Sequence, residues 1–196
     1  MSEITTAGIF CASSPRIDQE YFNDADEVTG ILVRNKITIY FGGGKYGLMG
    51  QIATRVNRDN GKIVGVIPRF MKEENWHHEN IKKMIVVNSM HERKETILNK
   101  SEVLIAFPGG CGTVEELMEA ITWKQLGLYT EPIIIVNTKG YYNPLLTFLE
   151  KMINENFLRE VHRDMWSVIE KPSEIMNAIR KSPPWSVKAR NFAAVK

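Results

Sequence analysis

A glycine-rich turn at residues 108–113 has the residue types and spacing to bind a phosphate. It reads Pro-Gly-Gly-Cys-Gly-Thr, follows the apolar run Val103–Phe107 and precedes an amphipathic segment. Glycines at positions 109, 110 and 112 can adopt positive φ and let a ligand approach the backbone amides closely. We expect a helix to begin at Thr113, with its first N–H groups free at the positive end of the helix dipole. The turn therefore predicts an anion site; a tight turn without a ligand is the alternative, but one glycine would suffice for it.

Two acids, Glu115 and Glu116, follow this turn closely enough to share its site. The spacing from Thr113 to Glu116 fits the capping box S/T-x-x-E, and spacing alone favours capping over catalysis for Glu116. A phosphate bound to the same amides would repel both carboxylates. Such a site would need a cation nearby.

Residues 89–94, Ser-Met-His-Glu-Arg-Lys, supply candidate cations. They follow the apolar run Met84–Val87, and the carboxyl ends of parallel strands open at one edge of a sheet. Arg93 is therefore placed to face the glycine turn and its acids. On spacing alone, a solvated helix residue with glutamate neighbours is the favoured alternative.

A second glycine turn, at residues 42–47, fits the G-x-G-x-x-G pattern of dinucleotide-binding folds. The acid that would bind ribose at the end of the next strand is missing, because residues 62–67 run into a proline and an arginine. Tyr46 and Leu48 stand where a P-loop needs its lysine and hydroxyl. A ribose or phosphate contact fits this turn, whereas NAD does not.

Three further groups carry weaker signals. Ser13 and Ser14 follow the first apolar run and suit a cap or a phosphate donor equally well. Residues 77–79, His-His-Glu, have no second group of metal ligands at useful spacing, so we expect a surface turn and no metal site. Cys111 has no histidine placed to act as its partner, which argues against a cysteine nucleophile.

The elements that must position these residues alternate along the chain. Apolar runs read as buried strands, because both of their faces are apolar: Gly8–Cys11, Ile37–Phe41, Lys62–Ile67, Met84–Val87, Val103–Phe107, Ile133–Val136 and, more weakly, Trp166–Ile169. Helical patterns lie between and after them: Glu20–Asn35, Leu48–Arg58, Met90–Lys100, Val114–Leu126, Pro144–Asn156 and Ser173 to about Arg180. This alternation predicts an α/β fold, a parallel sheet with helices on both faces.

The whole chain of 196 residues suits a single domain over residues 1–181, followed by a loosely ordered tail at 182–196 that contains two adjacent prolines. Its net charge of +2, with basic residues dispersed, argues against nucleic-acid binding. The amino terminus lacks a signal-peptide pattern, and no apolar run is long enough to span a membrane. Two cysteines a hundred positions apart suggest no disulfide framework, so we expect a cytoplasmic protein.

Three segments in this order, residues 42–50, 89–94 and 108–116, resemble the LONELY GUY (LOG) family, long catalogued as possible lysine decarboxylases. The resemblance extends from Ile9 to about Ile179. It implies a Rossmann-like, doubly wound fold, a homodimer, and no metal or cofactor. It also implies hydrolysis of the N-glycosidic bond of a purine nucleoside 5′-monophosphate, of the cytokinin type with an N6-substituted adenine, to free base and ribose 5-phosphate.

The resemblance also assigns roles to residues. Arg93 and Glu116 match the catalytic pair of the family. Glu74 matches an acid near the base, although Glu73 or Asn75 could instead occupy the matching position. Ala12 departs from the glycine common in the family at that position. The residues expected to contact the nucleotide are Ser13, Ser14, Gly43, Gly44, Glu74, Met90, Lys94, Pro108, Gly109, Gly110, Gly112, Thr113, Glu115 and Thr122.

Three other functions remain open at this level. The nearest is a nucleosidase acting on AMP or on purine nucleotides in general, which differs only in its substrate. A non-catalytic nucleotide or molybdenum-cofactor carrier would share the fold, but the presence of both Arg93 and Glu116 argues for turnover. A pyridoxal-dependent decarboxylase would need a Schiff-base lysine, and neither Lys45 nor Lys94 has a recognisable cofactor context.

Overall fold

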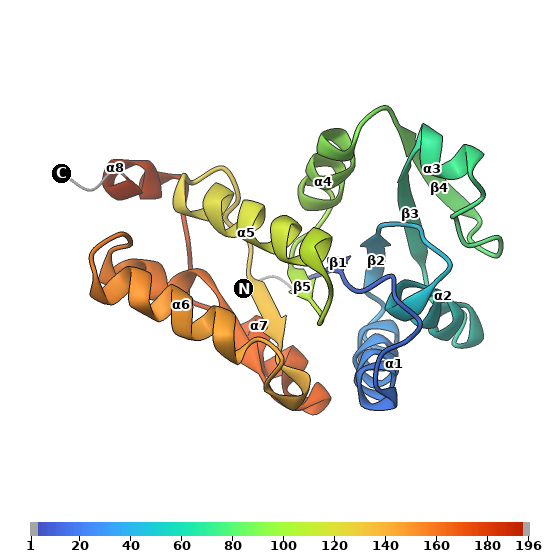
Figure 1. Ribbon diagram of the computed structural model, residues 1–196, viewed down its shortest axis with the longest axis horizontal. Coiled ribbons are helices and arrows are strands. Elements are labelled where there is room, and N and C mark those ends of the chain that lie inside the picture. Colours follow the sequence, from blue (N-terminus) through green and yellow to red (C-terminus); the bar gives the residue numbers. More distant parts are fainter. Residues whose placement is uncertain (1–3, 194–196) are drawn as a thin grey trace.

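The computed structural model describes residues 4–193, the last two as backbone only. Seven parallel strands form one sheet in the order β4-β3-β2-β1-β5-β6-β7 (Figure 1). Their bounds are β1 (Thr6–Phe10), β2 (Thr38–Phe41), β3 (Ile63–Pro68), β4 (Lys83–Val87), β5 (Leu104–Ala106), β6 (Ile133–Val136) and β7 (Ser167–Ile169). The predicted parallel sheet is confirmed, and each expected strand lies within two residues of its observed bounds.

Helices connect these strands. The α-helices are α1 (Gln19–Arg34), α2 (Gly47–Arg58), α3 (Arg69–Glu73), α4 (Met90–Asn99), α5 (Cys111–Gln125), α6 (Asn143–Asn154), α7 (Ile175–Lys181) and α8 (Arg190–Ala193). The 3₁₀ turns are η1 (Thr138–Gly140), η2 (Glu160–Met165), η3 (Pro172–Glu174) and η4 (Val187–Ala189). Neither α3 nor the 3₁₀ turns were predicted, because one or two turns of helix are too short to show an apolar period.

Each face of the sheet packs against its own set of helices. One face is covered by α1, α2 and α7, whose apolar residues join one cluster with Ile9, Phe41 and Ile105. The other face is covered by α4, α5 and α6. Their apolar residues join a second cluster with Phe10 of β1, Val66 of β3 and Leu104 of β5. In Figure 1, α1 and α2 lie on the side of β2 opposite to α4 and α5. The sheet is therefore doubly wound, as the sequence predicted.

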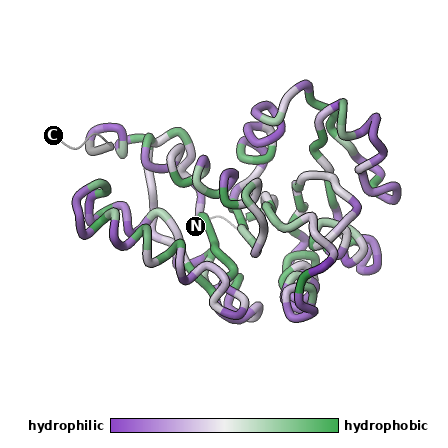
Figure 2. The backbone as a smooth tube through the Cα atoms, viewed as in Figure 1, coloured by the Kyte–Doolittle hydropathy of each residue, from purple (hydrophilic) through white to green (hydrophobic). Residues whose placement is uncertain are grey.

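The burial of the strands explains why their sequences are apolar throughout. All residues of β3 and β6 are buried, which fits strands covered on both faces. The hydropathy colouring shows β6 as a continuous hydrophobic stretch (Figure 2). Neither β3 nor β6 shows the alternation of apolar and polar residues that marks a half-exposed strand. The sequence therefore identifies them by the length and composition of the apolar run and not by its period.

The strand order reverses at β1, which pairs with β2 on one side and with β5 on the other. The chain leaves β1 towards α1 and β2, and later returns from α4 to β5 on the other side of β1. In such sheets a crevice forms beyond the carboxyl ends of the strands on either side of the reversal. Residues 11–14, 42–47 and 107–113 follow β1, β2 and β5 at this crevice.

The segment after α7 was expected to be loosely ordered. In the structure it contains η4 and α8, and Trp185 Nε1 donates a hydrogen bond to the carbonyl of Lys124 at 2.6 Å. Residues 194–196 of that segment, like residues 1–3 of the predicted domain, lie outside the described residues. Within residues 4–193, no helix combines the length and apolar character that crossing a membrane requires.

Candidate active site

The glycine turn after β5 leads directly into α5, but the helix begins earlier than expected. It starts at Cys111, and its N-cap, Gly110, makes no side-chain capping bond. Thr113 is therefore not the first helical residue, and neither Glu115 nor Glu116 lies in the first turn. The capping interpretation of Glu116 is wrong. The free amides expected at a helix start belong to residues from Cys111 onward.

The glycines of this turn differ in what their missing side chains allow. None of Gly109, Gly110 and Gly112 has positive φ, so the turn does not use the conformational freedom that the sequence offered. A Cβ on Gly109 would lie 2.2 Å from Thr113 Oγ1, and so its absence allows tight packing. A Cβ on Gly110 or Gly112 would meet nothing within 4 Å. These two glycines border open space at the start of α5.

The carbonyl groups of the turn are held by the rest of the protein. The hydroxyl of Tyr142 donates to the carbonyl of Phe107 at 2.7 Å, and that of Tyr141 donates to the carbonyl of Gly109 at 2.6 Å. Between them, the carbonyl of Pro108 accepts from the amide of Ala12 at 3.1 Å. Three successive carbonyls are thus engaged, which fixes the peptide planes that lead into α5.

Arg93 reaches this region from α4, whose start is held by hydrogen bonds to the side chains of Ser89 and Glu92. Ser89 Oγ accepts from the amide of Glu92 at 3.0 Å, and Glu92 Oε2 accepts from the amide of Asn88 at 2.7 Å. Arg93 itself is only 6% exposed, so its interpretation as a solvated helix residue is wrong. Its Nε donates to the carbonyl of Val66 at 3.2 Å, and its Nη2 donates to that of Gly42 at 2.9 Å.

Arg93 and Glu116 face each other across the crevice. Arg93 Nη1 lies 3.9 Å from Glu116 Oε1, and both side chains are largely buried. Burial raises the pKa of Glu116 to about 7, although the positive charge of Arg93 acts to lower it. Burial also lowers the pKa of Arg93, against the opposing effect of Glu116. A carboxyl group that titrates near neutral pH beside a fixed cation is typical of a catalytic site.

Lys94 forms a second charged group beside this pair. Its Nζ lies 2.5 Å from Glu115 Oε1 and 2.9 Å from Glu119 Oε2. Burial acts to lower the pKa of Lys94, but its hydrogen bonds with both carboxylates raise it overall. The cation is therefore retained between two acids of α5 and joins α4 to α5.

Two adjoining cavities open at this crevice. One, of about 200 Å³, includes Gly110, Gly112, Thr113 and both Arg93 and Glu116 in its lining. The other, of about 230 Å³, has a mostly apolar wall formed by Tyr46, Met49, Ile67, Met71 and Trp76. Ser13, Gly42, Met49, Met71 and Arg93 line both cavities. The first, which we call the polar cavity because it holds the Arg93–Glu116 pair and the free amides, thus adjoins a second, apolar cavity with aromatic rings.

The second glycine turn, after β2, closes one side of these cavities. Gly47 has φ of +60°, and a Cβ there would lie 2.6 Å from the carbonyl carbon of Ser13, so only glycine fits. Gly44 pairs with His77 in an antiparallel bridge, and the carbonyl of Gly43 accepts from the amide of His78 at 2.9 Å. This turn and the loop after α3 are therefore joined by backbone hydrogen bonds. Among the described residues, no three histidine, cysteine or acidic side chains gather as a metal site would require.

The remaining expected contact residues differ in their placement. Ser13 and Met90 line the polar cavity, and Pro108 is buried in the turn itself. Seven of the expected contact residues line neither cavity: Ser14, Gly43, Glu74, Lys94, Pro108, Gly109 and Thr122. The hydroxyl of Ser14 accepts from the amide of Arg16, Glu74 is the exposed C-cap of α3, and the hydroxyl of Thr122 donates to the carbonyl of Met118.

Sequence reasoning missed several residues that line the site. Cys11 lines the polar cavity, and burial raises the pKa of its thiol. Its position directly after β1 was the available signal, since that end of the strand opens on the crevice. Met49, Met71 and Trp76 gave no such signal, because apolar residues in helices and loops read equally well as core. The two tyrosines at 141 and 142 come from beyond β6 and were likewise missed.

Comparison with protein families gives a match over most of the chain. A family described as possible lysine decarboxylase matches residues 49–179. A relative from Oryza sativa subsp. japonica, named a probable cytokinin riboside 5′-monophosphate phosphoribohydrolase, is 36% identical over 90% of this chain and 72% of its own length. A cytokinin riboside 5′-monophosphate phosphoribohydrolase from Arabidopsis thaliana is 35% identical over 90% of this chain and 77% of its own length.

Solved structures share the fold at lower sequence identity. The molybdenum cofactor carrier protein of Chlamydomonas reinhardtii has a TM-score of 0.69 at 17% identity, covering 90% of this chain and 96% of its own. The molybdenum cofactor binding protein of Rippkaea orientalis has a TM-score of 0.67 at 15% identity, covering 92% of this chain and 98% of its own. At such identities the likeness concerns the fold alone.

Proposed function

Because the chain belongs to the LOG family, the family described as possible lysine decarboxylases, we propose that it is a phosphoribohydrolase that removes the base from a purine nucleoside 5′-monophosphate. The substrate class is a cytokinin-type nucleotide, and the products are the free base and ribose 5-phosphate. Named relatives at 35–36% identity over 90% of the chain carry this activity in their names. The observation that supports it best is the buried Arg93–Glu116 pair beside the open start of α5.

The two cavities suit the two ends of such a nucleotide. The 5′-phosphate lies against the free amides at the start of α5, where Gly110 and Gly112 leave open space. The base extends into the apolar cavity, whose Tyr46 and Trp76 offer ring faces and whose methionines adapt to an N6 substituent. The ribose then lies between them, next to Arg93 and Glu116, which border the polar cavity.

Cleavage of an N-glycosidic bond develops positive charge on the sugar, as in glycoside hydrolysis. As a carboxylate, Glu116 stabilises that charge at C1′ or orients the attacking water. Water adds its oxygen to C1′ and gives up a proton, while the electrons of the C1′–N bond leave with the base, which takes up a proton. Arg93 stays protonated; it is held by two backbone carbonyls and positions Glu116 and the ribose hydroxyls.

The first prediction concerns this pair. Arg93→Ala and Glu116→Gln should each reduce release of ribose 5-phosphate from N6-isopentenyl-AMP by at least about 100-fold, the usual scale for a lost catalytic group. The measurement is product release from N6-isopentenyl-AMP and AMP side by side. Arg34→Ala and Glu95→Gln, which change exposed residues of α1 and α4, are the matched controls and should keep wild-type rates. Wild-type turnover by Arg93→Ala or Glu116→Gln would contradict the assignment.

The same assay separates the other functions that the sequence left open. A higher kcat/KM for AMP than for the prenylated nucleotide would identify a general nucleosidase. Tight binding without product would identify a carrier. Lys94 is engaged by two carboxylates, which leaves it unsuited to hold a pyridoxal cofactor as a Schiff base.

We also propose that the protein is a homodimer, as the resemblance implies, and that it is cytoplasmic, as its cysteine usage suggests. In support of the dimer, Leu126 and Leu128 are exposed by 43% and 56% at the end of α5, and Val187 is exposed by 60%. Val187 adjoins these leucines, since a Cβ on Gly127 would lie 2.9 Å from its carbonyl oxygen. Adjacent exposed apolar side chains of this kind favour a protein partner.

A further inference from the structure

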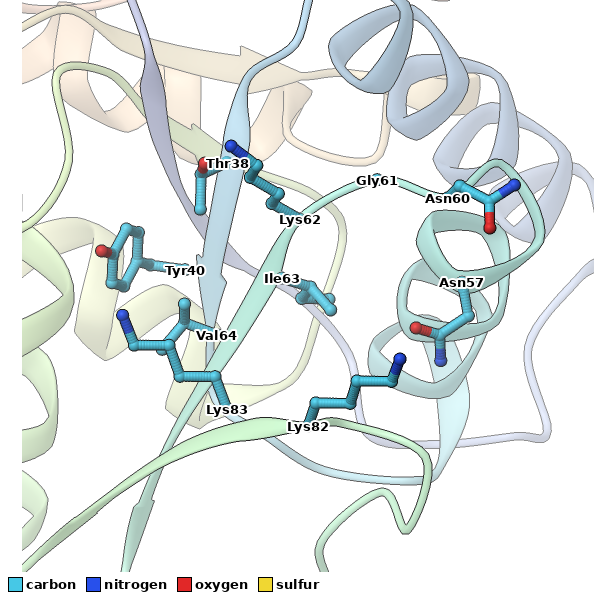
Figure 3. Close-up of a pocket in the computed structure, with 10 residues that line it drawn as sticks. All are labelled: Thr38, Tyr40, Asn57, Asn60, Gly61, Lys62, Ile63, Val64, Lys82 and Lys83. Atoms are coloured by element: carbon cyan, nitrogen blue, oxygen red, sulfur yellow. The ribbon is translucent and has the colours of Figure 1, made fainter.

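A second hollow lies at the opposite edge of the sheet from the active site. It has a volume of about 490 Å³ and is formed by the amino ends of β2, β3 and β4 with the end of α2 (Figure 3). Three lysines contribute to its lining: Lys62 precedes β3, Lys82 precedes β4 and Lys83 begins β4. We call this feature the lysine hollow.

The positive charge of the lysine hollow is not compensated by neighbouring acids. Its lining contains no carboxylate. Across residues 4–193, Lys62, Lys82 and Lys83 take part in none of the ion pairs. Asp59 is close in sequence, but Arg55 binds its carboxylate at 2.6 Å and Arg58 lies 3.5 Å from it. Like charges gathered without a counter-charge attract an anionic ligand.

The backbone around the hollow is held in place. Asn60 has φ of +53°, and a Cβ on Gly61 would lie 2.8 Å from Val33 and 2.9 Å from Val56, so the turn before Lys62 packs tightly against α1 and α2. Asn57 Nδ2 donates to the carbonyl of Asn80 at 3.3 Å, which connects the end of α2 to the segment that carries Lys82. The lysines therefore extend from fixed positions.

We propose that the lysine hollow binds a chain of at least two phosphate groups, as in inorganic polyphosphate or the tail of a nucleoside triphosphate. The ammonium groups spread around the hollow: Lys62 points toward Thr38, Lys83 toward Tyr40 and Lys82 toward Asn57 (Figure 3). A single phosphate is too compact for groups spread in this way, which is why the proposed ligand carries linked phosphates. Thr38, which lies beside the ammonium group of Lys62, adds a neutral donor there (Figure 3).

This site is separate from the proposed active site. Strand β3 joins the two, since Lys62 precedes it and its Val66 accepts the hydrogen bond from Arg93. At a rise of about 3.3 Å per residue, Lys62 lies about 13 Å from Val66 along the strand. Binding at the lysine hollow therefore does not depend on the identity of the substrate at the other edge.

The test is calorimetric titration of the full chain with sodium tripolyphosphate at low salt, with ribose 5-phosphate in excess to occupy the active site. The variant K62Q/K82Q/K83Q should bind at least about tenfold more weakly, because it loses three charge-assisted contacts. The control K100Q/K151Q/K181Q removes the same charge from exposed lysines elsewhere and should bind within about twofold of wild type. Arg93→Ala should also bind as wild type does.

Four results would overturn the proposal, and three of them concern the site: equal binding by K62Q/K82Q/K83Q, loss of binding in Arg93→Ala, or tighter binding of a single-stranded oligonucleotide than of tripolyphosphate to the same lysines. Parallel titrations with ATP and orthophosphate distinguish the sources of the phosphate chain. Tighter binding of ATP than of tripolyphosphate identifies a nucleotide, and equal binding identifies the phosphate chain alone. Orthophosphate binding as tightly as tripolyphosphate would contradict the requirement for linked phosphates.

Discussion

Single residues in the site owe their chemistry to burial more than to their neighbours in sequence. Glu116 is the clearest case, because loss of water raises the pKa of its carboxyl group to about 7 although Arg93 lies 3.9 Å away. Arg93 keeps its place through two backbone carbonyls and not through this acid alone. The pair is thus an arrangement in which the cation is fixed and the carboxyl group titrates.

The raised pKa of Glu116 gives a prediction about stability. The folded protein holds this proton more tightly than the unfolded chain, whose glutamate titrates near 4.5. Raising the pH from 4.5 to about 7 therefore destabilises the wild type, and the full cost, of the order of 3 kcal/mol, is present above pH 7. Glu116→Gln lacks this cost, so its free energy of unfolding relative to wild type should increase between pH 4.5 and pH 8.

Urea denaturation of both proteins at the two pH values measures this difference. Glu95→Gln, on the exposed part of α4, is the control and should show no such trend. A difference between Glu116→Gln and wild type that stays constant with pH would show that Glu116 titrates as an ordinary surface acid.

Tyr141 gives a second prediction at the residue scale. Its hydroxyl holds the carbonyl of Gly109, which precedes the free amides at the start of α5. Tyr141→Phe removes one hydrogen bond of about 1 kcal/mol and loosens those amides, so KM should rise about fivefold with little change in kcat. Steady-state kinetics on N6-isopentenyl-AMP measure the two constants. Tyr21→Phe, whose ring packs edge-on against Tyr141 at 5.9 Å, is the control; an equal rise in KM there would show that the effect does not depend on the hydrogen bond to Gly109.

Among the elements, the turn between β5 and α5 shows how the position of a helix start determines function. Because α5 starts at Cys111, Glu115 and Glu116 lie in its second turn, and Glu116, which the spacing suggested as a cap, faces Arg93. At the start of α4, Ser89 caps the helix and Glu92 holds the amide of Asn88. Each helix thus delivers one member of the catalytic pair from a defined start.

The two kinds of glycine in this turn should respond in opposite ways to alanine. Gly109→Ala places a methyl group against buried Thr113 and should destabilise the protein by about 1–3 kcal/mol. Gly112→Ala meets no atom within 4 Å and lies within α5, so stability should be kept or slightly raised, while the methyl group occupies space meant for the phosphate and raises KM. Thermal unfolding and steady-state kinetics on both variants check this contrast. Normal KM in Gly112→Ala would place the phosphate elsewhere.

At the scale of the whole molecule, the sheet separates two regions of different chemistry. The carboxyl edge holds paired charges and two cavities, and the amino edge holds the unpaired lysines of the lysine hollow. A third region, the end of α5 with Val187, exposes apolar side chains. Each region is built from segments that are distant in the chain. The single sheet brings these segments together, because the loops at each of its two edges lie side by side.

The proposed dimer yields the prediction for this scale. Light scattering after size-exclusion chromatography should give twice the mass of the chain for wild type. Leu128→Glu, which introduces a charge among Leu126 and Val187, should shift the protein to a monomer without a change in its circular dichroism. Lys151→Glu, an exposed change on α6, should leave the dimer intact. A monomeric wild type would contradict the dimer, and a dimeric Leu128→Glu would place the interface on another surface.

The sequence by itself determined the alternation of strands and helices, the doubly wound sheet and the family, because apolar runs and glycine motifs are local patterns. It left three matters to the tertiary structure. Whether Arg93 is solvated or buried depended on carbonyls from β3 and from the turn after β2, far away in the chain. Whether Glu116 is a cap depended on where α5 starts, which spacing alone cannot fix. The apolar cavity is lined by residues of α2, α3 and the loop after α3, which become neighbours only when the chain folds, so the sequence could not identify them as one site.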